Sequence, residues 1–541
     1  MTNQPVHVLV VGAGPVGLTM AAALTHHDLK CRLIDKAAEP TDKSKALVVW
    51  SRTLELLDNL DLATTFVETG MKIDGASIYG SGKRLVHLAI SGLNSPFGFP
   101  LMIPQSETER LLTEHLKEKG VDVERQVELL TFTEQDDSLV GKLRHTDGRE
   151  ESFTVPWLIG CDGAHSTVRH TLGMHFIGHA EPNDWLLADV HIEGTLSTTE
   201  ISVFWHEKGV LVLFPISKDR FRVIADIGKA GVDRPADPTL AEVQAKVDER
   251  GPGGLKLVDP VWLAGFRINE RKVTDYRKGR VMLAGDAAHI HSPAGGQGMN
   301  TGMQDAFNLA WKLALIQRGQ GQAKPLLDSY SQERSAIGDQ VLRGAEKMTQ
   351  IATLRNPVAQ FLRNHIASVV SSFGFVQDKI KNALCELSIN YRHSALSVED
   401  WPMGRGGEAA GDRLGDAPLL SAQNGKPTTL FRVIHGTRHA LLLLPSVNDQ
   451  DTVSALLKIT KEAEQAYPNV MSTNLILKTA ANLTAHSQVP VWLDADGTVH
   501  RQLGANDNTL VLVRPDGYIG YRCQPADGKA LLQYLGRYLK S

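Results

Sequence analysis

The strongest constraint on the fold lies in the first 35 residues, which contain an apolar strand, a glycine-rich turn, a helix and a second strand. Residues 7–11 are mostly β-branched or apolar, and the turn after them is GAGPVG. Residues 18–24 are small or apolar helix formers, and a second strand over 31–34 ends on Asp35. A strand that continues through such a turn into a helix is typical of a parallel α/β sheet. We therefore predict an N-terminal α/β domain of the Rossmann type.

Each glycine of this turn has its own physical role. Gly12 and Gly14 permit a tight turn and a close approach of the backbone to a diphosphate, and Gly17 lets the helix pack on the strand. The helix N-terminus, which includes Pro15, presents N–H groups and the positive end of its dipole to phosphates. Asp35 lies where a carboxylate would accept hydrogen bonds from an adenosine ribose. The motif predicts a dinucleotide site, for FAD or NAD; a purely structural turn is the alternative.

Length, charge and cysteine usage narrow the class of protein. A chain of 541 residues predicts two or three domains. A net charge of −4 and the lack of a long basic run predict no nucleic-acid partner. No apolar run reaches membrane-spanning length, and the N-terminal sequence lacks a secretion signal, so we expect no membrane partner. The four cysteines are scattered without a CxxC pair, which suits a reducing compartment. We expect a cytoplasmic enzyme.

Two later stretches repeat the pattern of an apolar strand followed by a polar turn. In WLIGCDGAHSTVRHTLG the strand ends at Asp162-Gly163, and in RVMLAGDAAHIHSPAGGQGMNTGMQDAFNLAWKLA it ends at Gly285-Asp286. The second stretch closes with residues at three- and four-residue spacing, which predict a helix with one apolar face. Its glycine-rich middle fits a phosphate loop, a metal site on His289 and His291, or another binding surface.

The three motifs together resemble one enzyme family. GAGPVG, Asp162-Gly163 and Gly285-Asp286 occur in the order typical of single-component, FAD-dependent aromatic hydroxylases, the class A flavoprotein monooxygenases. The resemblance covers essentially the whole chain and is greatest to the phenol hydroxylase-like branch, which includes pentachlorophenol monooxygenase. It implies a p-hydroxybenzoate hydroxylase-like fold with FAD as the cofactor and NADH or NADPH as the reductant.

The resemblance also implies roles for individual residues in cofactor binding. Asp286 would hold the ribityl–diphosphate arm of FAD, and Pro293 would line the reactive edge of the flavin. Gly298, Met299 and Asn300 would place backbone N–H groups near the flavin N1/C2=O end. Reduced flavin carries negative charge there, and a helix N-terminus is suited to stabilise it.

Four more residues complete the implied cofactor site. Asp162 is associated in the family with both FAD and the nicotinamide cofactor, and Gln105 of PQSETERLL would touch the flavin or its ribityl chain. Family members usually carry Arg-Ala after the second strand, where this chain has Lys45-Ala46. Lysine keeps the positive charge but lacks the bidentate fork of arginine, so Arg52 is expected to assist Lys45.

A metal site is not expected from the sequence. His289 and His291 are spaced HxH, but no Cys/His/Glu cluster of ligand spacing accompanies them. His289 is interpreted as a hydrogen-bonded residue behind the cofactor, and Cys161 as a small core residue.

The substrate side is predicted as an antiparallel meander over 199–228, with turns at 207–209 and 217–219. Benzoate hydroxylases of this fold hold the substrate carboxylate with a Ser and an Arg, where this chain aligns Phe214 and Ile216. An apolar lining does not offset the desolvation of a carboxylate. We therefore predict a neutral phenol or polycyclic phenolic substrate.

Trp205 and His206 are further candidates on this meander. A histidine here could deprotonate a phenol, because its unperturbed pKa lies near working pH. The alternative is a surface histidine beside a hairpin turn.

The C-terminal third is predicted to begin with a helical connector. A Gly- and Pro-rich stretch over 401–418 is interpreted as a linker. Strand candidates over 439–444, 474–477, 509–513 and 518–521 then suggest a compact α/β unit. VLVRPDGYIGYR resembles the end of the thioredoxin-like domain of the same branch, but without CxxC we expect a stabilising and dimerising domain.

The predicted architecture has three parts. Residues 1–75, 105–180 and 270–395 are assigned to a Rossmann-type FAD-binding domain with its helical connector. Residues 76–104 and 181–269 form an inserted substrate-binding β-sheet domain, and residues 400–541 a thioredoxin-like domain.

The activity implied by the resemblance is oxygen transfer from O₂ to an aromatic ring. NAD(P)H would reduce FAD, and a flavin C4a-hydroperoxide would then hydroxylate a small aromatic substrate. Epoxidation, Baeyer–Villiger oxidation or inactivation of an antibiotic on the same scaffold is the alternative. A flavin halogenase is disfavoured because WxWxIP is absent, and intact cofactor motifs disfavour a non-catalytic protein. A homodimer is expected.

Overall fold

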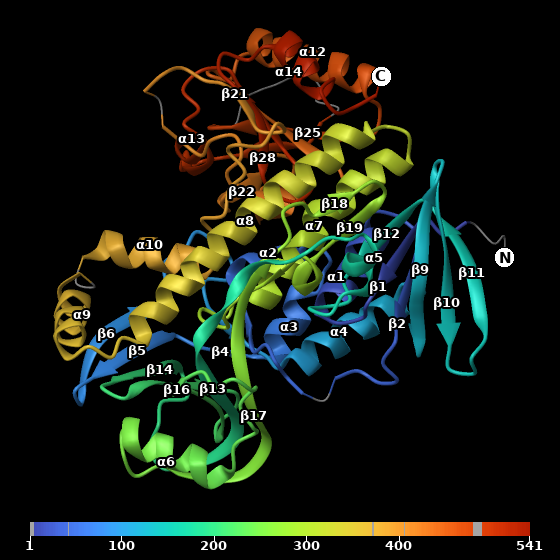
Figure 1. Ribbon diagram of the computed structural model, residues 1–541. Coiled ribbons are helices and arrows are strands. Elements are labelled where there is room, and N and C mark those ends of the chain that lie inside the picture. Colours follow the sequence, from blue (N-terminus) through green and yellow to red (C-terminus); the bar gives the residue numbers. More distant parts are fainter. Residues whose placement is uncertain (1–4, 42, 371–372, 405, 480–488, 541) are drawn as a thin grey trace.

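The computed structural model describes residues 5–540 apart from 42, 371–372, 405 and 480–488. The chain forms an N-terminal α/β domain, an eight-stranded sheet beside it and a C-terminal α/β domain, and the long helix α8 (Ala323–Ala352) runs diagonally between them (Figure 1). Among the described residues, no helix is both long and apolar enough to span a bilayer.

The N-terminal domain is built on a six-stranded sheet in the order β18-β19-β12-β1-β2-β8. All neighbours in it pair in parallel except β18 with β19. These strands are β1 (Val8–Val11), β2 (Cys31–Asp35), β8 (Val123–Arg125), β12 (Trp157–Gly160), β18 (Arg277–Lys278) and β19 (Val281–Leu283). The apolar side chains of β1, β2, β12 and β19 belong to the most extensive hydrophobic core among the described residues. The Rossmann-type α/β domain predicted from the sequence is confirmed.

Helices and short strands surround this sheet. α1 packs against α7 and α4, as expected from its small, apolar surface. The elements are α1 (Pro15–His26), α2 (Ser51–Asp58), α3 (Ala63–Thr69), α4 (Gln105–Glu118), α5 (Thr167–Thr171) and α7 (Gly298–Gln317), the sheet β3 (Val48–Val49), β7 (Leu101–Met102) and β4 (Met71–Lys72), and the sheet β9 (Val127–Gln135), β10 (Ser138–His145) and β11 (Glu150–Val155).

The second large sheet has the order β20-β17-β13-β16-β15-β14-β5-β6. Its strands are β5 (Gly75–Gly80), β6 (Lys83–Ala89), β13 (Ile177–Glu193), β14 (Glu200–His206), β15 (Gly209–Pro215), β16 (Arg220–Lys229), β17 (Lys256–Lys272) and β20 (His289–Ile290). β14, β15 and β16 pair antiparallel, which confirms the predicted meander and both of its turns. One face packs on α6 (Leu240–Arg250).

Helices α8, α9 (Pro357–Val370) and α10 (Gly374–Leu384) form the predicted helical connector. The C-terminal domain follows, with its sheet in the order β21-β28-β27-β24-β25-β26-β22-β23. Its elements are β21 (Val398–Asp400), β22 (Pro418–Ser421), β23 (Pro427–Thr429), α11 (Leu430–Ile434), β24 (His439–Leu444), α12 (Gln450–Ala466), β25 (Met471–Leu477), β26 (Val491–Leu493), α13 (Thr498–Leu503), β27 (Thr509–Val513), β28 (Ile519–Cys523) and α14 (Gly528–Leu535). The predicted strands over 439–444 and 509–513 agree with β24 and β27.

The stretch over 401–418 is not a free linker, which corrects the interpretation from its composition. Residue 405 lies outside the described residues, but Leu414 is fully buried and Arg413 donates hydrogen bonds to Glu55 of α2. The glycines allow the chain to turn closely over its neighbours: a Cβ on Gly411 would lie 2.4 Å from the backbone nitrogen of Arg392. This stretch therefore packs the C-terminal domain onto the N-terminal one.

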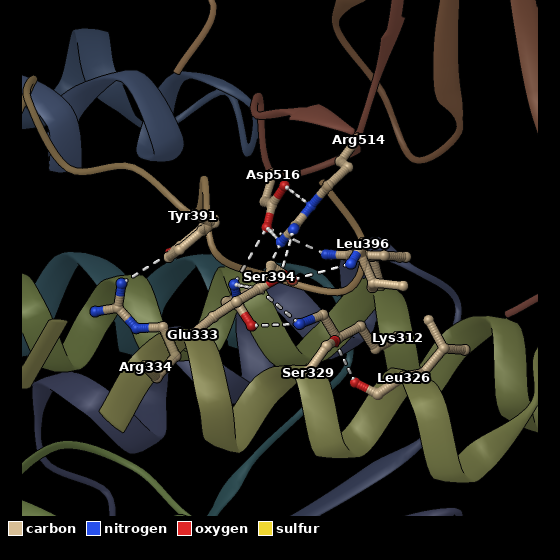
Figure 2. A network of polar contacts seen from close by, with 12 residues as sticks. Lys312, Leu326, Ser329, Glu333, Arg334, Tyr391, Ser394, Leu396, Arg514 and Asp516 are labelled. Carbon is tan, nitrogen blue, oxygen red and sulfur yellow. Dashed lines mark hydrogen bonds and ion pairs between the residues drawn. The ribbon is translucent and has the colours of Figure 1, made fainter. Parts of the chain in front are cut away.

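A buried polar network joins the same two domains (Figure 2). Glu333 of α8 accepts hydrogen bonds from Lys312 of α7, at 2.9 Å, and from Arg514, at 2.7 and 2.9 Å. Arg514 also pairs with Asp516, which accepts a hydrogen bond from the indole N–H of Trp311. Removing any member would leave a buried charge without its partner.

Candidate active site

Four motif loops follow four adjacent strands of the N-terminal sheet. Asp35 ends β2, the glycine turn follows β1, Asp162 follows β12, and Asp286 follows β19. The sheet order places these strands side by side as β19-β12-β1-β2, and they are parallel. Parallel strands present their carboxyl ends at one edge, where α/β sheets bind their ligands. The structure thus brings together motifs that lie up to 270 residues apart in sequence.

The glycine turn is closed on one side and open on the other. A Cβ on Gly12, whose φ is +102°, would lie 2.4 Å from the carbonyl oxygen of Cys161, and one on Gly17 would lie 1.8 Å from that of Gly12. A Cβ on Gly14 would meet nothing within 4 Å. Gly14 is the N-cap of α1, no side chain caps this helix, and Pro15 occupies its first turn. The open N-terminus offers its N–H groups to an anion.

Asp35 and Asp162 stabilise the loops around this helix end. Asp35 accepts hydrogen bonds from the N–H groups of Ala13, at 2.6 Å, and Ala37, at 2.7 Å. Asp162 accepts one from the Ser166 hydroxyl at 2.5 Å and one from an N–H of α5. Burial raises the pKa of the Asp162 carboxyl, and these hydrogen bonds oppose that shift.

Asp286 follows β19, the second strand of the sheet order, at this same edge. Its side chain keeps an exposed surface, yet the protein packed around it raises the pKa of its carboxyl, while His289 and Lys45 act in the opposite direction. A Cβ on Gly285 would lie 2.7 Å from a methyl group of Val16, so Asp286 lies beside the first turn of α1. A carboxylate in this position can accept hydrogen bonds from ligand hydroxyl groups.

The segment that carries Lys45 is held from two sides. Gln105 accepts a hydrogen bond from the N–H of Ala46 at 3.1 Å, and its own N–H donates to the Ser44 hydroxyl at 2.6 Å. Arg222 of β16 donates to the carbonyl oxygens of Ser44 and of Lys45, at 2.8 Å for the latter. The Lys45 side chain itself is exposed, beside Asp286.

The Asn300 side chain links the glycine-rich loop before α7 to the strand β3 by hydrogen bonds. Its side chain accepts a hydrogen bond from the N–H of Trp50 at 2.9 Å and donates to the carbonyl oxygen of Val48 at 2.8 Å. The Trp50 indole N–H donates to the carbonyl oxygen of Gly295 at 3.0 Å. Pro293 is exposed, and Gly298 and Met299 open α7 without a side-chain cap. The sequence identified this loop but not Trp50, which lies in an apolar run with no motif of its own.

A buried charge cluster behind Asp286 was also not found from the sequence. Asp305 of α7 is fully buried and accepts hydrogen bonds from the N–H of Gly285, from Arg334 and from His289, at 2.9, 2.6 and 3.0 Å. The His289 ring stacks on that of His291, with centroids 6.0 Å apart. The hydrogen-bonded role expected for His289 is confirmed, and its partner is a carboxylate.

Phe214 and Ile216 share a hydrophobic cluster with Trp50, the residue bound to the glycine-rich loop. Both pack on the cluster that contains Val48 and Trp50, together with Val203 and Val212 of the same sheet. The cation on this face of β16, Arg222, is bound by Asp189 at 2.8 Å and is 2% exposed. The surface formed by Phe214, Ile216, Val203 and Val212, called the apolar wall below, therefore carries no unpaired cation from Arg222.

Trp205 shares the face of Phe214, whereas His206 lies on the opposite face of the sheet, contrary to the expectation for His206. Directly paired residues point to the same face of a sheet, so the pair of Val203 with Val212 places Phe214 and Trp205 on one face and His206 on the other. The Trp205 ring lies 4.3 Å from the Arg363 guanidinium, and His206 accepts a hydrogen bond from the N–H of Lys208 at the hairpin. The geometry does not support His206 as a base for a ring bound at Phe214.

Arg52 is also not placed beside Lys45 as expected. Its guanidinium is buried and donates hydrogen bonds to Glu55, at 2.9 Å, and to the carbonyl oxygen of Asp516, at 2.5 Å. It lies 4.8 Å from the Tyr518 ring. The first turn of α2 directs this side chain toward the C-terminal domain, so Arg52 joins two domains.

Residues 5–345 match the family described as the FAD binding domain. That match covers more than half of the chain and includes all four motif loops. The chain belongs to the FAD-dependent aromatic hydroxylases. It is 34% identical over 531 residues to 6-methylpretetramide 4-monooxygenase of Streptomyces rimosus, which covers 96% of this chain and 90% of that protein. Identity to pentachlorophenol 4-monooxygenase of Sphingobium chlorophenolicum is 31%, over 98% and 96% of the two chains.

Solved structures of aromatic hydroxylases share the fold. CabE, an aromatic hydroxylase from angucycline biosynthesis, superimposes with a TM-score of 0.76 at 26% identity, over 98% of this chain and 99% of that one. The complex of aklavinone-11 hydroxylase with FAD and aklavinone has a TM-score of 0.78 at 22% identity, over 99% of both chains. The p-hydroxybenzoate hydroxylase-like fold is confirmed.

The residues of this hydroxylase fit FAD. The uncapped α1 and the open Gly14 suit the diphosphate, and the accessible carboxylate of Asp286 suits a hydroxyl-bearing chain. Each oxygen of Asp35 accepts one hydrogen bond within the protein, which leaves acceptor capacity for ribose hydroxyls.

Proposed function

We propose that this hydroxylase uses NADH or NADPH and O₂ to hydroxylate a neutral phenolic or polycyclic aromatic substrate. The observation that carries the substrate class is the apolar surface of Phe214 and Ile216, which share a hydrophobic cluster with Trp50, the residue bound to the glycine-rich loop. A carboxylate placed there would lose its hydration without gaining a cation, because Arg222 is already paired with Asp189.

The relatives support this class of substrate. By their names, one acts on 6-methylpretetramide and another on pentachlorophenol, and a solved relative carries aklavinone beside FAD. A wall that is apolar over the lengths of β14 and β15 suits a flat, fused-ring molecule as well as a single ring.

Bound FAD would supply hydride acceptance and the activation of O₂. The protein's own contribution is to position the ring and to exclude water. Phe214, Ile216 and Val212 would pack on the ring, and Trp50 would hold the Gly295 backbone in place against the flavin. The cofactor would be held by the side chains of Asp162, Asp286 and Gln105, with Lys45 as the cation beside its diphosphate. It would also be held by the backbone N–H groups of Gly298, Met299 and Asn300. A transiently bound nicotinamide cofactor is part of this proposal, as are a homodimer and a cytoplasmic location.

The test is a panel of matched aromatic compounds assayed for NADH and NADPH consumption, O₂ uptake and product mass. The panel pairs each phenol with the same phenol carrying a carboxylate, and includes fused-ring phenols. We expect neutral compounds to give product plus one oxygen atom and their carboxylates to lose at least 100-fold in kcat/KM. Equal turnover of the carboxylates would refute the substrate class. An epoxide, an inserted ring oxygen or an inactivated antibiotic would show the alternative chemistry, and failure of both nicotinamides to reduce bound FAD would refute the proposal.

A further inference from the structure

A group of acidic residues and one histidine lies between the eight-stranded sheet and α8. His179 and Glu181 are on β13, Glu270 is on β17, and Glu346 is on α8. His179 is paired with Glu270 across the two antiparallel strands. One potential ligand atom from each of His179, Glu270 and Glu346 lies within 4.8 Å of the others. These side chains are separate from the residues assigned to the cofactor and substrate.

Two of the carboxylates are buried without sufficient partners. Glu270 is 2% exposed and Glu181 is 6% exposed, and one oxygen of each accepts no hydrogen bond. Buried carboxylates are normally paired with a cation or fully hydrogen-bonded, because removing a lone carboxylate from water costs on the order of several kcal/mol. An unsatisfied Glu270 oxygen among other ligand atoms therefore indicates a missing partner.

No lysine or arginine of the described chain forms an ion pair with these acids. The imidazole of His179 lies beside them, with its Nε2 3.9 Å from Glu181 Oε1. Burial raises the pKa of Glu270 to about 7, and the neighbouring Glu181 and Glu346 add to that shift. Lys272, two residues along β17, binds Ser335 and Asp339 instead of these acids.

We propose that His179, Glu270 and Glu346 bind a divalent transition-metal ion, Mn²⁺ or Zn²⁺, with Glu181 adding negative charge beside it. Donors around such an ion lie about 2.0–2.2 Å from it, so roughly 3–4 Å from each other, and rotation of the exposed His179 would close the remaining gap. One imidazole with carboxylates suits these ions, whereas a site built of oxygen alone would suit Mg²⁺ or Ca²⁺.

The ion would join α8 to the sheet next to the active site. Thr349 lies one turn after Glu346 on α8 and forms a hydrogen bond with Ser292 at 2.9 Å. Ser292 directly precedes Pro293 in the glycine-rich loop. A bound ion therefore stabilises the position of the helix that supports this loop, and it takes no part in oxygen transfer.

The experiment measures metal binding to the FAD-loaded, chelator-treated full chain by calorimetry with MnCl₂ and with ZnCl₂. We expect about one ion per chain and a thermal unfolding temperature that rises with the ion. E270Q should weaken binding at least 10-fold and abolish that rise. E193Q, an exposed change on β13, the strand that carries His179, should leave both unchanged.

His179→Ala provides a second variant, because this exposed residue can be changed without opening the core. It should fold normally and weaken binding of Zn²⁺ at least 10-fold. Absence of saturable binding up to millimolar ion, or equal binding by E270Q and the parent, would overturn the proposal. So would an infrared band of a protonated Glu270 at pH 6 that persists when the ion is present. None of these readouts depends on monooxygenase activity.

Discussion

The ammonium group of Lys312 lies 2.9 Å from the carboxylate of Glu333, and both side chains are fully excluded from solvent. Lys312 is on the helix that begins at the glycine-rich loop, and Glu333 is on α8. Arg514 binds the other side of Glu333, so the C-terminal domain shares this carboxylate (Figure 2). The position of α7 at the active site is therefore tied to the docking of a domain that is distant from it in sequence.

The Glu333→Gln variant should lose about 3–5 kcal/mol of unfolding free energy, because it leaves the buried Lys312 ammonium without its paired carboxylate and Arg514 with Asp516 alone. Chemical denaturation of the holoenzyme measures this loss. Lys324→Gln on the same helix, which removes a surface ion pair with Asp328, should change it by less than about 0.5 kcal/mol. Equal stabilities of the two variants would contradict the network's role.

Changes at two glycines of the first turn should have different effects. Gly17→Ala places a methyl group against the Gly12 carbonyl and should lower both the unfolding temperature and FAD affinity. Gly14→Ala meets no protein atom, so the cofactor-free protein should keep its unfolding temperature while FAD binds at least 10-fold more weakly. Fluorescence titration with FAD and thermal unfolding distinguish the two. Unchanged FAD affinity in Gly14→Ala would show that the cofactor does not approach this turn.

Asp286→Asn should weaken FAD binding and stabilise the cofactor-free protein. Because the folded protein raises the pKa of this carboxyl, the charged form is disfavoured by folding, and a neutral side chain should raise the unfolding temperature of the cofactor-free protein at pH 7. Loss of a charged acceptor should weaken FAD binding by about 1.5–3 kcal/mol, or roughly 10- to 150-fold. Asp136→Asn, at an exposed turn, is the control. Tighter or unchanged FAD binding would argue against contact with the cofactor.

Phe214→Ala should lower kcat/KM about 10- to 100-fold, since a buried aromatic contact contributes roughly 1.5–3 kcal/mol. It should also raise the fraction of NAD(P)H whose electrons are released as H₂O₂, because water reaches the flavin. Phe204→Leu on the opposite face of the sheet should reduce stability without changing that fraction. Coupling of product to NAD(P)H consumption is the measurement, and identical coupling in both variants would exclude Phe214 from the pocket.

His439 should contribute to acid unfolding. Burial lowers the pKa of its ring to about 3, and Arg514 adds to that shift. Between pH 6.5 and about 3 the unfolded chain therefore binds a proton that the folded chain does not, so stability falls as pH falls through this window. His439→Gln should flatten the dependence of unfolding free energy on pH by up to about 1.4 kcal/mol per pH unit near pH 5. Parallel curves for variant and parent would contradict this.

The glycine turn and the strands before Asp162 and Asp286 could be predicted from the sequence, because their conformations depend on local residue types. Glycines at 12 and 17 are required by contacts under 2.5 Å, and the strands before Asp162 and Asp286 are short, apolar and fully buried. The alternation of residue types over 199–228 likewise predicted the meander, since successive side chains of a strand point to opposite faces of the sheet.

Which side chains meet was decided only by the tertiary structure. Arg52 follows Lys45 closely in sequence, yet the helix that begins at Ser51 turns it toward Asp516, 464 residues away. His206 and Phe214 are eight residues apart, but the hairpin register places them on opposite faces. The sequence by itself determined the cofactor-binding edge, because backbone conformation there depends on glycine and strand pattern. The partners of buried charges such as Glu333 and Asp305 depend on long-range packing, which local patterns do not encode.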